Sequence, residues 1–313
     1  MTSRVAAVDC GTNSLRMLIA DVPERPVGAI ADVVRRMEII RLGEGVDATG
    51  RLAPHALDRM EGVLREYAKQ ISESGAVAVR MVATSATRDA QNAADFVRRV
   101  VEVLGIEPEV LSGDAEARLS FTGATAELAT VTTGPCLVAD IGGGSTELVL
   151  GLPGGEPSCA ISVNVGCVRM TERHLRDDPP TAAQIAAATA DIDAALAQAA
   201  TVVPAEQART LVGLAGSVTT VAAIALGLND YDPAVLHHAR IPAADVHEVT
   251  SGLLAQTHAQ RAALGVMHPG RVDVIGGGAL VLDRIVRRFG FAEVLVSEHD
   301  ILDGIAWSLA AKA

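Results

Sequence analysis

The chain has 313 residues, with 26 Lys and Arg against 38 Asp and Glu, which gives a formal net charge of −12. Hydrophobic residues make up 49% and charged residues 20%, a composition that builds a large folded core and excludes intrinsic disorder. The acidic balance excludes a general nucleic-acid or membrane-surface binder, because both need a broad positive field, and the 2% aromatic content leaves few platforms for stacked bases.

The cysteines and the N-terminus indicate a cellular compartment. Cys10, Cys136, Cys159 and Cys167 form no CxxC pair and have no His at ligand spacing, which favours reduced thiols. Asp9 comes too early for the apolar part of a signal peptide, and no stretch of about 18 uncharged apolar residues follows. We expect a cytoplasmic protein whose length suits two domains of ordinary size.

The first expected element is a β-hairpin with a polar turn. Apolar residues 5–8 predict a strand that runs into Asp9, and residues 15–20 predict its partner strand. The turn, 10–14, places hydroxyl and amide groups beside the carboxylate.

Helix and strand patterns then alternate. Residues 54–73 place apolar side chains on one helical face, with a proline in the first turn and Gly75 just past the end. A β-branched run at 77–83 predicts a buried strand, and 93–104 predicts a second helix closed by Gly105. Alternation of this kind predicts an α/β layered fold.

Two charged residues in this half have both a structural and a functional interpretation. Arg88 follows the buried strand, where α/β sheets bind ligands, yet a surface-loop charge explains it equally well. Glu116 lies in the first turn of a helix that opens near Ser112 or Asp114, where helix capping is by itself the stronger interpretation.

The hairpin pattern occurs a second time, about 130 residues later. Residues 8–19 can be laid on 139–150 without a gap, and Asp9, Gly11 and Ser14 then fall on Asp140, Gly142 and Ser145. Two matching turns are hard to explain as coincidence, so the repeat favours a function for both. Because no low-complexity linker separates the halves, we place the domain boundary from the repeat, near residue 125.

The second half continues the alternation. We expect a helix over 181–200, a strand over 211–215, a helix opening at Ser217, a strand over 293–297 and a final helix over 301–311. Pro153, Pro157, Pro179 and Pro180 mark surface loops in this half. Residues 272–275 fit a strand or a helix start, because three glycines follow them.

The glycine-rich turn has the chemistry of a phosphate site. Gly142, Gly143 and Gly144 lack a Cβ atom, so consecutive amides can approach an anion as a nest, and hydroxyls follow at Ser145 and Thr146. An adjacent Asp140 would repel phosphate unless a divalent cation lay between them, which makes it a candidate Mg²⁺ ligand. The first turn offers Asp9, Asn13 and Ser14 in the same way. Gly216 and Ser217, before a helix, form a further possible anion site, although a plain N-cap explains Ser217 as well.

These segments, taken in order, resemble the exopolyphosphatase and guanosine pentaphosphate phosphohydrolase (Ppx/GppA) family. The motifs that carry the resemblance lie at residues 9–17, 83–92, 111–121, 140–149, 164–173, 213–224, 268–282 and 296–307. The resemblance implies two ribonuclease-H-like domains of the actin, sugar-kinase and acetate-kinase superfamily, flanking an interdomain cleft. It also implies that the final helix, from about His299, packs on the first domain, which gives domains of 1–125 with 299–313 and 126–298.

The resemblance implies roles for individual residues. Glu116 would orient or deprotonate the attacking water, and Asp140 and Glu147 would be the Mg²⁺-associated carboxylates, with Asp9 as a further metal ligand. The expected phosphate contacts are Asn13, Ser14, Arg88, Gly143, Gly144, Ser145, Thr146, Gly216 and Ser217. Transfer of a phosphoryl group to water needs positioning, charge neutralisation and one water-orienting group, which these residues supply.

The chain departs from the family pattern in two places. Ala115 stands where many relatives have a second Glu, beside an intact Glu116. The chain also ends after the second domain, where longer relatives continue into an HD-type helical region, so we expect a short-form member with a preference for shorter polyphosphates. Equal or rising efficiency on very long chains would count against that preference.

Several functions stay open at this point. The first expectation is Mg²⁺-dependent hydrolysis of the terminal phosphate of inorganic polyphosphate, and the second is conversion of guanosine pentaphosphate to the tetraphosphate. An ATP-dependent kinase is also possible, since 213–219 and 276–278 could cradle a nucleotide, as is a phosphate or alarmone sensor without turnover. We expect no nucleic-acid or membrane partner, and a homodimer is possible.

Overall fold

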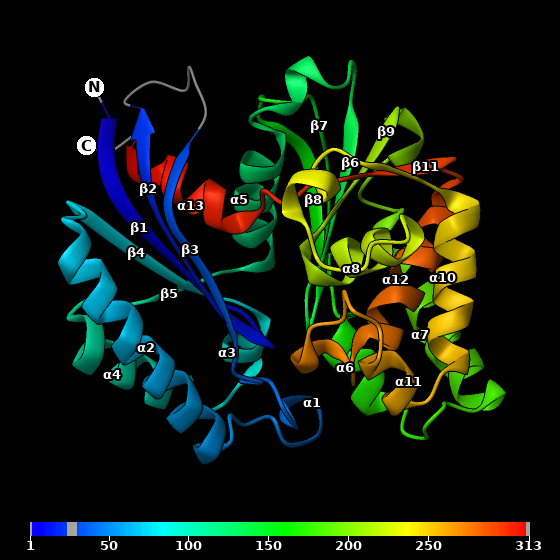
Figure 1. Ribbon diagram of the computed structural model, residues 1–313, viewed down its shortest axis with the longest axis horizontal. Helices are drawn as coiled ribbons and strands as arrows, with labels where there is room; N and C mark the ends of the chain where they lie inside the picture. The colour runs from blue at the N-terminus through cyan, green and yellow to red at the C-terminus, as the bar shows by residue number, and fades with distance from the viewer. Residues whose placement is uncertain (1, 24–29, 311–313) are drawn as a thin grey trace. The chain divides into compact units, whose positions relative to one another are not determined.

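The computed structural model describes residues 2–23 and 30–310. The chain divides into two units, Met1–Gly123 with Asp300–Ala313, and Ala124–His299. Each unit contains one mixed β-sheet with helices packed against it (Figure 1).

The strands of the first unit lie in the order β3-β2-β1-β4-β5. Their bounds are Thr2–Cys10 (β1), Ser14–Pro23 (β2), Ala31–Ile39 (β3), Ala78–Ala83 (β4) and Glu109–Val110 (β5). Strands β1, β2 and β3 pair antiparallel, whereas β4 pairs parallel with both β1 and β5. The order places β1 in the interior of the sheet, and the first predicted turn lies between β1 and β2.

Helices cover both faces of this sheet. They are Val46–Thr49 (α1), Pro54–Ser74 (α2), Ser85–Asp89 (α3), Ala93–Leu104 (α4), Gly113–Thr125 (α5) and Ile301–Ala310 (α13). Alternate residues of a strand point to opposite faces, so Ala6 and Val8 pack toward α2 and α4, while Val5 and Ala7 pack toward α13 (Figure 1). Burial on both faces explains why β1 reads as a continuous apolar run.

The second unit repeats this arrangement with one added strand. Its order is β10-β11-β9-β6-β7-β8, with bounds Cys136–Ile141 (β6), Thr146–Gly151 (β7), Pro157–Val163 (β8), Thr210–Leu214 (β9), Arg240–Pro242 (β10) and Glu293–Val296 (β11). Strands β6, β7 and β8 are antiparallel, β9 is parallel to β6 and β11, and β10 is antiparallel to β11. Without β10, both sheets have the ribonuclease-H-like order that the resemblance implies.

Helix α12 forms the centre of the second unit's helical layer. The α-helices are Cys167–Arg173 (α6), Ala182–Ala199 (α7), Ala215–Ala225 (α8), Pro233–Leu236 (α9), Ala243–Ala255 (α10), His258–Ala262 (α11) and Ile275–Phe289 (α12), with 3₁₀ turns at Leu128–Thr130, Ala205–Gln207 and Pro269–Arg271. Helix α12 contacts α6, α7, α8 and α10. Its first turn contains Gly276, Gly277 and Gly278, and a Cβ atom at Gly278 would lie 2.1 Å from Ser217 Oγ, so these glycines allow close helix packing.

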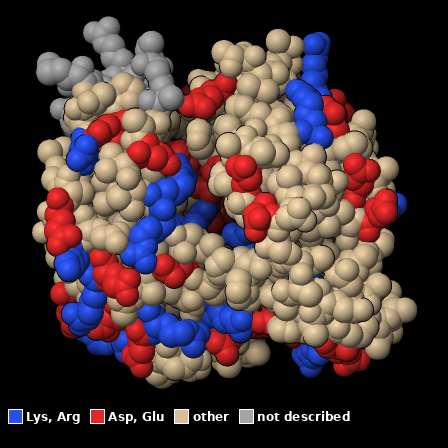
Figure 2. All heavy atoms as spheres, in the orientation of Figure 1, with Lys and Arg blue, Asp and Glu red and all other residues tan. Residues whose placement is uncertain are grey.

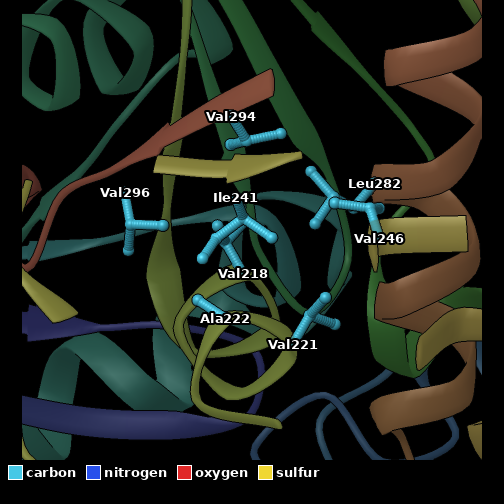
Figure 3. A pocket seen from close by; sticks show the side chains of 8 residues that line it. All are labelled: Val218, Val221, Ala222, Ile241, Val246, Leu282, Val294 and Val296. Carbon is cyan, nitrogen blue, oxygen red and sulfur yellow. The ribbon is translucent and has the colours of Figure 1, made fainter. Parts of the chain in front are cut away.

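The interior of the second unit is filled by small aliphatic side chains. Figure 3 shows eight of them, from α8, α10, α12, β10 and β11, facing one another: Val218, Val221, Ala222, Ile241, Val246, Leu282, Val294 and Val296. The space between them has no room for a water molecule. This region is packed core, and it is not a ligand pocket.

Most of the predicted elements are confirmed. The helices expected at 54–73 and 93–104 are α2 and α4, and Gly75 and Gly105 end them at φ values of 74° and 69°. Residues 272–275 lead into a helix, since α12 begins at Ile275. The final helix begins at residue 301, as expected, and its expected last residue, 311, lies outside the described residues.

Two predictions about the second half are wrong. Pro157 begins the edge strand β8, since the first residue of an edge strand needs no backbone donor, and does not mark a loop. Helix α8 opens at Ala215, which has a φ of 67°, two residues before the predicted start, and no side-chain cap is formed there. Ser217 is therefore not an N-cap.

Charged side chains are unevenly distributed over the surface. On the face shown in Figure 2, basic and acidic side chains lie intermixed over the first unit, and uncharged residues dominate over the second. Among the described residues, no helix combines the length and apolar character that crossing a bilayer requires.

Candidate functional site

The first turn is held in shape by backbone hydrogen bonds. Gly11 N donates to Ser14 O at 2.9 Å and closes the turn. Asn13 O accepts from the N–H groups of Ile40 and Arg41, both at 2.9 Å. The segment after β3 therefore fixes the peptide that precedes Ser14.

Asp9, beside this turn, is paired with a cation of its own unit. It lies directly opposite Arg16 in the β1–β2 register, and Arg16 Nη2 lies 2.6 Å from Asp9 Oδ2. Arg16 Nη1 also binds Asp300, which begins the C-terminal segment of this unit. Burial raises the pKa of Asp9 above its usual value, and the Arg16 guanidinium opposes that shift. Asp9 Oδ1 is buried and makes no hydrogen bond among the described residues.

Arg88 and Glu116 form an ion pair in the same unit. Arg88 lies in the short helix α3, directly after β4, and its Nη1 lies 2.9 Å from Glu116 Oε2. The same nitrogen donates to Leu111 O at 3.0 Å. The α5 cap is made by Ser112, whose Oγ accepts from Ala115 N at 3.3 Å, and the Glu116 carboxylate binds Arg88. Ion pairing thus accounts for the orientation of Glu116, a residue for which capping had been the stronger interpretation.

The second turn repeats the backbone closure of the first. Gly142 N donates to Ser145 O at 3.0 Å. Two further carbonyl groups of this turn accept hydrogen bonds from the backbone of α6. Gly142 O accepts from Cys167 N at 2.9 Å, and Gly143 O accepts from Val168 N at the same distance. A Cβ atom at Gly166 would lie 2.6 Å from Gly143 O, so the start of α6 presses directly against the turn.

Two buried acids lie opposite each other beside this second turn. Asp140 and Glu147 are direct partners in the β6–β7 register, and they are 7% and 1% exposed. Ser162 Oγ donates to Glu147 Oε1 at 2.7 Å. Like charges directly opposite in a sheet are destabilising, and a cation between them relieves the repulsion. Carboxylate oxygens are hard ligands, so this donor set fits Mg²⁺.

The repeat thus differs at one informative position. When 8–19 is laid on 139–150, Arg16 falls on Glu147, so the cross-strand partner of the Asp is a cation in one copy and an acid in the other. Sequence reasoning missed Arg16, although counting the hairpin register outward from the turn would have paired it with Asp9.

Three further predicted phosphate contacts, Thr146, Gly216 and Ser217, lie in the second unit, each with different neighbours. Thr146 is fully buried, and its hydroxyl donates to Val165 O at 2.6 Å. Ser217 is 6% exposed, and its hydroxyl hydrogen-bonds Cys167. A Cβ atom at Gly216 would overlap the Arg271 guanidinium, at 2.2 Å from its central carbon, so the start of α8 lies against a positive charge.

The predicted residues divide between the units. The first unit contains Asp9, Asn13, Ser14, Arg88 and Glu116, and the second contains Asp140, Gly143, Gly144, Ser145, Thr146, Glu147, Gly216 and Ser217. Their assignment to one site stays a prediction.

A cluster that sequence reasoning did not single out also lies in the second unit. Ligand atoms of Glu127, His237 and His299 lie within 4.8 Å of one another. Glu298 N, however, donates to His237 Nδ1 at 3.2 Å, which places the proton of a neutral ring on Nε2, the atom that faces Glu127. In this tautomer, Nε2 of His237 has no lone pair to offer a metal ion, so the cluster is a poor metal centre.

Comparisons with known proteins place the chain in one family of phosphatases. The model of the Ppx/GppA phosphatase family matches residues 19–313. Exopolyphosphatase 2 of Mycobacterium tuberculosis is 49% identical over 318 residues, which cover 98% of this chain and 99% of that protein. The crystal structure of an exopolyphosphatase-like protein matches with a TM-score of 0.94 at 42% identity, covering 99% of both chains. The Ppx/GppA family member of Aquifex aeolicus matches with a TM-score of 0.82 at 29% identity, covering 100% of this chain and 99% of that one.

Proposed function

Because this chain belongs to the Ppx/GppA phosphatase family, we propose that it is an exopolyphosphatase, which hydrolyses the terminal phosphate of inorganic polyphosphate and releases orthophosphate. The enzyme is thus a phosphoanhydride hydrolase. Its relative from Mycobacterium tuberculosis carries the name of this activity and aligns over nearly the full length of both chains.

The observation that carries the proposal is the buried acid pair beside the glycine turn. Asp140 and Glu147 lie opposite each other, and the turn between their strands contains Gly143, Gly144 and Ser145, whose amides can bind phosphate oxygens. Two acids alone would repel a polyanion. A bound Mg²⁺ would reverse that repulsion and neutralise charge on the phosphate oxygens.

We assign the other roles from the resemblance to the family. Glu116 orients or deprotonates the attacking water, and Arg88 holds its carboxylate at 2.9 Å. Asn13, Ser14 and Arg88 contact phosphate, as do Gly216 and Ser217. Asp9 is the weakest metal ligand of the set, because Arg16 already binds one of its oxygens, and only Oδ1 is available for a ligand.

Several further properties belong to the same proposal. The domains are 1–125 with 299–313 and 126–298, the protein acts in the cytoplasm, and neither nucleic acid nor membrane is a partner. We also propose that the protein forms a homodimer and that it prefers short polyphosphates.

Guanosine pentaphosphate is the second candidate substrate, because the family comprises both activities and hydrolysis of its terminal phosphate uses the same groups. Parallel assays of orthophosphate release from polyphosphate, guanosine pentaphosphate and ATP at one Mg²⁺ concentration separate the two. We expect the highest kcat/KM on polyphosphate, and loss of that activity when EDTA removes Mg²⁺. Turnover of guanosine pentaphosphate alone would replace the first proposal by the second.

Substitution of Glu116 tests its assigned role. Glu116→Ala should lower kcat by at least about 100-fold and leave substrate binding nearly unchanged, because a water-orienting group acts mainly in the transition state. Steady-state kinetics and calorimetric binding of tripolyphosphate measure the two quantities. Asp114→Ala, which removes an exposed acid in the same helical turn, is the matched control. A loss of affinity as large as the loss of rate would contradict the role.

A further inference from the structure

The second turn aims three consecutive amides in one direction. The carbonyl groups of Gly142, Gly143 and Gly144 all accept hydrogen bonds from α6. In a trans peptide the C=O points opposite to the N–H of the next residue. The N–H groups of Gly143, Gly144 and Ser145 therefore point away from α6, and they donate no hydrogen bond to any described residue.

The third carbonyl is held differently from the first two. Gly142 O and Gly143 O are bound by backbone N–H groups, which any residue of α6 except proline would supply. Gly144 O is bound by a side chain, with Arg169 Nε donating at 2.6 Å. Arg169 is partly buried at the start of α6, and its own N–H donates to Gly143 O at 3.1 Å.

We infer that Arg169 is a positioning residue, which orients the Gly144–Ser145 peptide and thereby aims the Ser145 N–H at a substrate phosphate. The inference rests on the proposed function. Gly144 has no Cβ atom to restrict its backbone, so without the Arg169 hydrogen bond this peptide can rotate and turn its carbonyl toward the anion. The guanidinium also adds positive charge to a turn that has two acids beside it.

The first turn supports this inference by contrast. Asn13 corresponds to Gly144 in the repeat, and its carbonyl accepts from the backbone N–H groups of Ile40 and Arg41. Asn13 also has a side chain that restricts rotation. The first turn therefore needs no arginine for this purpose, whereas the diglycine of the second turn does.

Kinetics of Arg169 variants test the inference. We expect Arg169→Ala to lower kcat by about 10- to 100-fold, with a smaller change in KM; this is less than the roughly 100- to 1000-fold cost of removing a donor, because the amide stays and loses only its orientation. Guanidinium added at millimolar concentration should restore part of the lost kcat. Arg169→Lys should stay impaired, because lysine has no donor at the Nε position. Arg173→Ala, which removes an arginine of the same helix paired with Asp191, should keep wild-type kcat.

A second measurement separates this inference from the proposed function. Inorganic phosphate with Mg²⁺ is titrated into ¹⁵N-labelled protein, and the amide resonance of Ser145 is followed. We expect a phosphate-dependent shift in the wild type and in Arg173→Ala, and a much smaller one in folded Arg169→Ala. If wild-type protein hydrolyses no polyphosphate, the proposed function fails while this shift still tests Arg169. A wild-type shift or wild-type kcat in Arg169→Ala would overturn the inference, as would an equal rescue of Arg173→Ala by guanidinium.

Discussion

The two hairpin turns are closed by the same backbone hydrogen bond, but the charges beside them differ. Each is closed by a hydrogen bond from its Gly N to its Ser O, at 2.9 Å in the first and 3.0 Å in the second. The Asp of the first turn faces Arg16, a cation that it shares with Asp300, whereas the Asp of the second faces the acid Glu147. The comparison teaches that a repeat can preserve the geometry of a turn while one cross-strand residue changes the charge beside it from a cation to an acid.

The sharpest way to break this comparison is to give the second turn the charges of the first. Glu147→Arg should lower kcat on polyphosphate by at least about 1000-fold, because the new guanidinium would pair with Asp140 and take the place that we propose for the metal ion. The isosteric Glu147→Gln guards against misfolding and should lose activity as well. Raised Mg²⁺ should restore neither variant. Activity near wild type in Glu147→Gln would show that the acid pair is not the metal site.

The reverse experiment removes the cation of the first turn. Arg16→Met leaves Asp9 and Asp300 without their guanidinium, and we expect a loss of about 3 kcal/mol in unfolding free energy, measured in urea. Arg65→Met, which breaks an exposed pair with Glu61, should cost less than about 1 kcal/mol.

The pH dependence of Arg16→Met gives a second check. Burial already raises the pKa of Asp9, and loss of Arg16 removes the opposing effect. An acid whose folded pKa lies above its unfolded value loses stability as pH rises through that interval. The deficit of Arg16→Met should therefore be larger at pH 8 than at pH 5, and an equal deficit would show that Asp9 stays ionised in both proteins.

The smallest expected effect concerns the support of the second turn. In Gly166→Ala, the new Cβ would lie 2.6 Å from Gly143 O, so the turn must shift away from α6. We expect a fall in kcat of about 10-fold and a stability loss of about 1–3 kcal/mol, measured by kinetics and urea unfolding. Gly62→Ala, at a helical position with open space around it, should keep activity and gain about 0.5–1 kcal/mol in unfolding free energy. Unchanged kcat in Gly166→Ala would mean that the turn does not depend on its contact with α6.

Local pattern was enough to predict many elements of this fold. Helices α2 and α4 were predicted because a 3.6-residue apolar period and a terminal glycine are properties of a short segment. Strands β3 and β10 were not predicted. Strand β3 is half-exposed with charged residues, and β10 has three residues, so neither shows a clear apolar alternation.

The candidate site divides in the same way. Asp9, Asp140 and the two turns stand out in the sequence because the same residue types recur at the same spacing. The ion pair of Arg88 with Glu116 does not stand out in the sequence. The two residues are 28 positions apart, and a Glu in the first turn of a helix is ordinarily explained by capping.

By itself, then, the sequence determined where the turns lie and which donors they contain, because turn geometry depends on adjacent residues. Tertiary structure decided which cation pairs with Asp9 and which group binds the Gly144 carbonyl. Asp300 reaches Arg16 from 284 residues away, and Arg169 reaches Gly144 O from a separate helix. Such contacts depend on strand pairing and helix packing, and no local pattern specifies them.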